Sequence, residues 1–152
     1  MSKENEKLDT LLNHPLTQLI QEMAITPARF QIILANGLLE MITNVIIKHH
    51  CKNHKIILAN NQTYTYATRL LILNEKGLID DAFYDLLRLF NTLRNKAAHG
   101  GKFYFKREWI DQFAPIFPKA LPDGQKLSYI CNHLTFNYYN ANHETLERYP
   151  LE

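Results

Sequence analysis

The chain has 152 residues, of which 46% are hydrophobic and 21% charged, with a formal net charge of +2. This length fits one domain with a sizeable core, and five glycines and six prolines exclude a fibrous or low-complexity protein. No apolar run reaches the roughly 18 residues of a membrane span, and the charged opening MSKENEKLDT lacks the apolar stretch of a secretory signal. With Cys51 and Cys131 in no CxxC pair, we expect a soluble, cytoplasmic protein with reduced thiols.

The first predicted elements are one or two short helices over 7–14 and 16–23, interrupted by a proline. Thr26 and Pro27 then supply an N-cap followed by proline at the first helical position. A long helix is therefore expected over about 28–50.

This long helix is apolar almost all round, which predicts a central and heavily buried element. The exception is a narrow polar stripe of residues spaced four apart, at Asn36, Glu40 and Asn44. Such spacing places the three side chains on one face of the helix.

A loop is expected over 52–63, followed by a helix over 64–75 that Gly77 ends. Asp80 then caps a further helix, which is expected to run to His99 and to stop at two glycines. Beyond it, 102–106 is expected as a short extended piece and 108–113 as a turn or two of helix.

The apolar spacing over 125–148 favours a last helix, although its aromatic content leaves a strand open. The sum is an all-α bundle of about five antiparallel helices, because the connections are mostly short. We expect a single domain over 1–152, with a helical arm at 1–25, a core at 26–113 and an extension at 114–152.

The stretch LFNTLRNKAAHGG carries the residues most suited to chemistry. At roughly 100° per residue, Arg94 falls near the middle of the apolar face, and Asn95 and His99 lie together at one edge. A guanidinium does not lose its proton, so an inward arginine requires carbonyls, a carboxylate or an anionic ligand. Asn95 and His99 are four apart, so the amide is expected to contact and orient the imidazole.

This arrangement of Arg94, Asn95 and His99 resembles the signature of the HEPN superfamily, small helical proteins that include many RNA-cutting members. The stretch TYTYATRLLILNEKGLIDDAFYDLLRLFNTLRNKAAHGGKFYF, preceded by the long helix with Glu40, is similar to the branch that contains the mannitol operon repressor. The resemblance covers about 30–113. In the repressor branch an acidic residue tends to follow the arginine, whereas Asn95 stands here, as in the nucleases.

The resemblance implies RNA cleavage without a metal or cofactor, by attack of the 2′-hydroxyl on the adjacent phosphorus. His99 would transfer the proton, Arg94 would hold the phosphate, and Asn95 would orient either group. The resemblance also implies a homodimer in which two motif helices face each other, and Ala97 and Ala98 are small enough to permit that approach.

Each of these roles has a structural alternative. Arg94 could be an ion-pair partner of Glu40, which we assign a supporting role, and His99 could only cap a helix end. Five basic residues without an acidic one, interleaved with aromatic rings, extend from Arg94 to Arg107. RNA contacts are therefore expected from Lys96, Lys102, Tyr104, Lys106 and Arg107, although rings in this stretch could equally belong to the core.

The stretch KHHCKNHK invites a metal interpretation because His50 and His54 are four apart. We disfavour it, since no second ligand cluster is evident and cationic groups gather at helix C-termini.

Two functions remain open. The first is a homodimeric, metal-independent endoribonuclease, in a toxin or phage-defence role. The second is a non-catalytic transcriptional regulator or interaction module similar to the mannitol operon repressor, acting through protein partners or a bound anion. The protein partner expected is an antitoxin or a regulatory protein. Sequence-specific DNA binding is poorly supported, because no helix-turn-helix with a basic recognition helix is found.

Overall fold

The computed structural model describes residues 27–99 and 105–148, and these residues contain helices and no strand. The predicted all-α class is therefore confirmed. The helices expected at 7–14 and 16–23 lie outside the described residues. Of the extended piece expected at 102–106, only Phe105 and Lys106 are described, and neither belongs to a strand.

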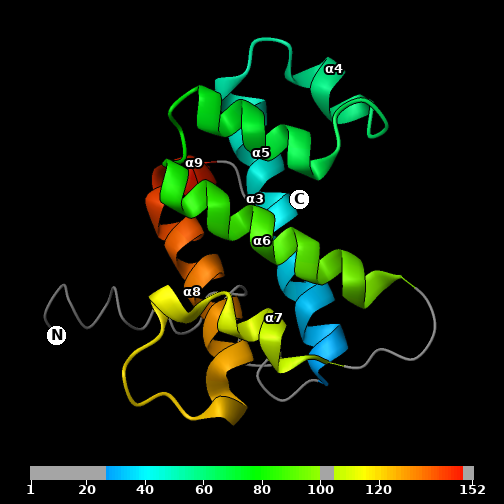
Figure 1. Ribbon diagram of the computed structural model, residues 1–152. Helices are drawn as coiled ribbons and strands as arrows, with labels where there is room; N and C mark the ends of the chain where they lie inside the picture. Colours follow the sequence, from blue (N-terminus) through cyan, green and yellow to red (C-terminus); the bar gives the residue numbers. More distant parts are fainter. Residues whose placement is uncertain (1–26, 100–104, 149–152) are drawn as a thin grey trace, which may run out of the picture.

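Seven α-helices lie within the described residues, more than the five expected (Figure 1). They are α3 (Ala28–His50), α4 (His54–Ala59), α5 (Tyr66–Glu75), α6 (Asp81–Ala98), α7 (Arg107–Asp111), α8 (Lys126–Ala141) and α9 (His143–Arg148). Two 3-10 turns, η1 (Ala114–Ile116) and η2 (Asp123–Gln125), connect α7 to α8.

The two additional helices have local causes. The loop expected over 52–63 contains α4, whose Ile57 is buried and so contributes an apolar contact to the core. The helix expected over 125–148 is divided at Asn142, whose amide Nδ2 donates to the carbonyl of Tyr138 at 3.0 Å. A side chain that bonds the preceding backbone competes with the helical hydrogen bonds and favours an interruption.

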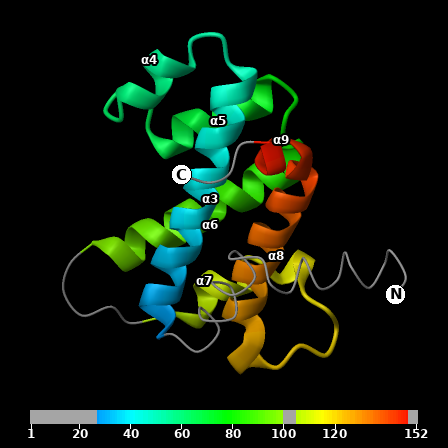
Figure 2. The same ribbon diagram turned by 180° about the vertical axis from the view of Figure 1, so that it is seen from behind.

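Helix α3 is the centre of the molecule, as its sequence predicted, and its bounds agree with those expected (Figures 1 and 2). It packs against α4, α5, α6, α8 and α9. By length and composition α3 could also cross a membrane, but about half of its most apolar window is buried inside the protein. That burial is what a central core helix requires.

Helix α8 runs parallel to α3, whereas the sequence predicted antiparallel neighbours. Near the start of both helices, Gln31 donates to Ser128 Oγ at 2.8 Å, and further along both, Thr43 Oγ1 lies 2.9 Å from Tyr138 Oη. The expectation was wrong here because it rested on short connections, and the connection from α6 to α8 spans α7 and two 3-10 turns. The segment expected as an extension thus supplies a core helix.

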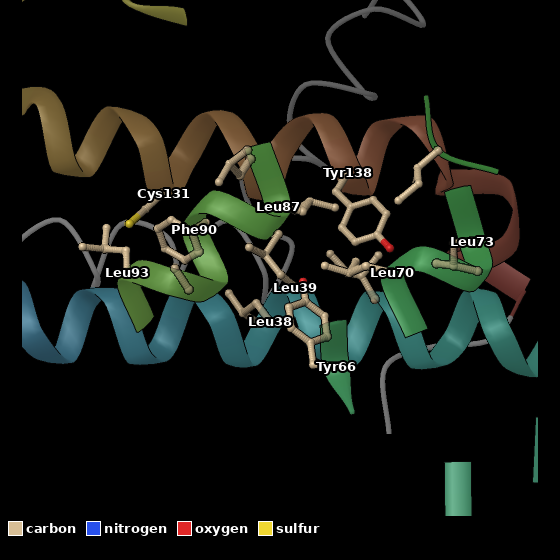
Figure 3. Packing of buried hydrophobic residues seen from close by; sticks show 14 of the residues in the cluster. Leu38, Leu39, Tyr66, Leu70, Leu73, Leu87, Phe90, Leu93, Cys131 and Tyr138 are labelled. Atoms are coloured by element: carbon tan, nitrogen blue, oxygen red, sulfur yellow. The ribbon is translucent and has the colours of Figure 1, made fainter. Parts of the chain in front are cut away.

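Helix α6 crosses α3 and places its apolar face between α3 and α8 (Figures 1 and 3). Leu87, Phe90 and Leu93 fill this space and are almost completely buried.

Asp80 caps α6 as predicted, accepting from the backbone amide of Phe83 at 2.8 Å. Gly77 turns the chain between α5 and α6 with a φ of 67°, a conformation that glycine adopts without steric cost. The buried residues therefore set the direction of α6 across α3, and Asp80 sets where it begins.

Candidate functional site at the end of helix α6

His99 lies at the exposed end of α6 and leaves the helix in an extended conformation. Its backbone amide makes the last hydrogen bond of the helix, to the carbonyl of Asn95 at 3.1 Å. The imidazole is exposed to solvent. A substrate can therefore reach this side chain.

Arg94 and Asn95 form a hydrogen-bonded pair on the last turns of α6. Arg94 Nη1 donates to Asn95 Oδ1 at 3.0 Å, and both side chains are half-buried. The sequence predicted that Asn95 contacts His99 instead, and among the described residues no side-chain hydrogen bond joins those two. That prediction was wrong: the hydrogen bond that the Asn95 side chain makes here is with the adjacent guanidinium. Asn95 therefore orients the arginine rather than the histidine.

Glu40 does not pair with Arg94 among the described residues. Its carboxylate Oε1 lies 3.7 Å from Nη1 of Arg69, a residue of α5. The ion pair considered between Glu40 and Arg94 is therefore not formed; Glu40 pairs with Arg69 instead. Among the described residues, Glu40 therefore contacts Arg69 and gives no direct support to Arg94.

Arg69 is a buried charge held mainly by amide oxygens. Its guanidinium donates to Asn44 Oδ1 at 2.9 Å and to Asn61 Oδ1, and the whole residue is 2% exposed. Two of the three stripe residues on α3, Glu40 and Asn44, therefore bind Arg69. Because a buried guanidinium must have oxygen partners, this cluster fixes α5 and the loop after α4 against α3.

Arg29 is a residue near the site that the sequence did not single out. It lies in the first turn of α3, and its Nε donates to the carbonyl of Ala97 at 2.8 Å. The two residues are 68 positions apart, so no local pattern could have joined them. The one sequence signal is a basic residue at a helix N-terminus, where acidic residues are favoured.

The basic residues expected to contact RNA have different surroundings. Lys96 Nζ lies 4.7 Å and Lys106 Nζ 6.0 Å from the centre of the Trp109 ring, which holds both cations near α7. Arg107 instead pairs with Asp123 at 3.0 Å. A hydrogen bond from Lys126 and the charge of Arg107 lower the pKa of the Asp123 carboxyl. Lys102 and Tyr104 lie outside the described residues.

Ala97 and Ala98, which were expected to permit close approach of a second motif helix, differ from each other. Ala97 is completely buried and packs in the core of its own chain, whereas Ala98 is exposed. Ala97 is therefore unavailable for contact with another molecule.

The histidine-rich stretch 48–55, which begins in the last turn of α3, forms local contacts. His54 Nδ1 lies 3.1 Å from the carbonyl of Cys51. Burial and the neighbouring charges of His50 and Lys48 lower the pKa of His49. Among residues 27–99 and 105–148, no three His, Cys, Asp or Glu side chains stand close enough to share a metal ion.

Comparisons with protein-family models, with curated proteins and with solved structures find no match for this chain.

Proposed function

We propose that the protein is a metal-independent endoribonuclease of HEPN type, in which Arg94 and His99 act on the same phosphate. One observation carries the proposal: Asn95 holds the Arg94 guanidinium on the last turns of α6, and an exposed histidine follows at the end of that helix. An oriented guanidinium and an accessible imidazole are the two groups that phosphodiester transfer requires.

In the proposed reaction, the 2′-oxygen of RNA forms a bond to the adjacent phosphorus and the bond to the 5′-oxygen breaks. The proton of the 2′-hydroxyl passes to an imidazole, and a second proton reaches the leaving 5′-oxygen. Arg94 offsets the negative charge on the non-bridging phosphate oxygens. The products are a 2′,3′-cyclic phosphate and a free 5′-hydroxyl.

Both proton transfers are more easily served by two histidines than by one. We therefore propose a homodimer in which the partner supplies a second His99. Lys96, Lys106 and Trp109 support RNA binding because they combine cations with an aromatic ring beside the end of α6. Arg107 contributes less, since Asp123 already pairs with it. Such an activity suits a toxin or a phage-defence component.

The test is cleavage of a labelled single-stranded RNA in excess EDTA. We expect cleavage with a 2′,3′-cyclic phosphate end, and a loss of at least roughly 100-fold in His99→Ala, the lower range for a general acid or base. His50→Ala is the matched control, because His50 is also exposed and also ends a helix. It should leave cleavage unchanged.

Both histidine variants should melt within about 2 °C of the wild type, since neither side chain is buried. Cleavage that requires an added metal ion, or that survives in His99→Ala, would contradict the proposal.

A second candidate is a non-catalytic regulator, similar to the mannitol operon repressor, that acts through a protein partner. It is favoured by an apolar stripe on the outer face of α3, where Phe30, Leu34 and Met41 are 58%, 43% and 36% exposed. Exposed apolar stripes of this kind mark protein contacts. This candidate predicts that RNA remains uncut with or without EDTA, and that Phe30→Asp changes the association state in solution.

A further inference from the structure

Arg29 stands where the electrostatics of its own helix disfavour it. It lies in the first turn of α3, which contains no acidic residue, so its charge faces the positive end of that helix dipole. One of its partners, the carbonyl of Ala97, belongs to the negative end of α6. The contact between α6 and α3 therefore offsets an arrangement that α3 alone would not favour.

The Ala97 carbonyl is one of the last four in α6, which have no partner further along an α-helix. The backbone hydrogen bond from His99 is accepted by Asn95, two residues before Ala97, so it does not involve the Ala97 carbonyl. Arg29, from another element, donates to this carbonyl at 2.8 Å. The last turn of α6 is thereby fixed to the first turn of α3, two residues before His99.

We propose that Arg29 is a positioning residue for His99: by holding the Ala97 carbonyl it sets the place and direction in which the imidazole leaves α6. The inference rests on the proposed nuclease function. The Nε of Arg29 is engaged with the helix end. Its main effect is therefore on the geometry of catalysis and not on the affinity for RNA.

The experiment compares Arg29→Gln and Arg29→Lys with Arg88→Gln as the matched control. Arg88 lies on the exposed side of α6, over the ring of Tyr84 at 5.5 Å, and does not touch the helix end. Arg29→Gln should lower kcat for RNA cleavage about tenfold and change KM less than twofold, because small displacements of a catalytic group reduce the rate steeply. Arg29→Lys, which can still donate to a carbonyl, should restore most of kcat. Arg88→Gln should match the wild type.

A second measurement does not depend on RNA. Amide hydrogen exchange at His99 should be at least tenfold faster in Arg29→Gln, while exchange at the buried Leu87 of the same helix should stay unchanged. Unchanged exchange at His99, or a rise in KM with constant kcat, would overturn the inference. If the wild type cuts no RNA, the proposed nuclease function fails, and exchange alone then decides whether Arg29 holds the end of α6.

Discussion

Arg69 and Arg94 should respond very differently to replacement by alanine, and the difference separates a structural arginine from a functional one. Arg69 is 2% exposed and donates to Asn44 and Asn61, with Glu40 3.7 Å away. Its removal deletes two hydrogen bonds from a buried charged donor to the half-buried Asn44 and the exposed Asn61. At about 1.5–3 kcal/mol for each hydrogen bond to a charged group, the loss is about 3–5 kcal/mol of the free energy of unfolding.

Arg94, by contrast, is half-buried and, within the part of the chain that the structure describes, donates one hydrogen bond, to the neighbouring Asn95 at 3.0 Å. Alanine forms helices as readily as arginine, so Arg94→Ala should cost about 0.5–1.5 kcal/mol. For a chain of this size, the melting temperature should fall by roughly 6–20 °C in Arg69→Ala and by roughly 1–6 °C in Arg94→Ala.

Urea unfolding followed by circular dichroism measures the free energy of unfolding of both variants. Arg88→Ala, on the exposed side of α6, is the control for loss of an arginine. RNA cleavage should nevertheless disappear in Arg94→Ala while the protein remains folded. If Arg94→Ala were as destabilising as Arg69→Ala, Arg94 would be a structural residue and the proposed phosphate role would lose its support.

Two further predictions concern the elements that carry the site. Asp80→Ala should lower the free energy of unfolding by about 1 kcal/mol in urea titrations, because it removes the side-chain cap of α6, whereas Asp80→Asn should change little. Burial raises the pKa of the Cys131 thiol from 9.0 to about 12, so the unfolded chain releases this proton first and stability is lost as pH rises from 9 towards 12. Between pH 9 and 10 the free energy of unfolding should fall by about 1 kcal/mol. If it fell as steeply with pH in Cys131→Ala, the loss would not come from the Cys131 thiol.

The elements of this fold that depend on local signals could be predicted from the sequence. The extent of α3 follows from its largely apolar sequence, and the start of α6 follows from the capping residue Asp80. The burial of Phe90 and Leu93 follows from helical spacing alone. In each case the information lies within a few residues along the chain.

The pairing of polar groups could not be predicted in this way. Asn95 is close in the sequence to both Arg94 and His99, and the spacing of residues does not decide which of the two its side chain contacts. Glu40 could reach an arginine on α5 or on α6, and only the crossing of these helices over α3 selects Arg69. The contact of Arg29 with Ala97 likewise depends on that crossing.

The parallel course of α3 and α8 has a consequence for synthesis on the ribosome. Helix α3 emerges early, whereas α8, which covers one of its sides, is complete only at Ala141. At about 5–20 residues per second, the 91 residues from His50 to Ala141 take roughly 5–18 s to be made. During that interval the most apolar helix of the described residues lacks its cover, so nascent chains that stop before α8 should be the ones that chaperones retain.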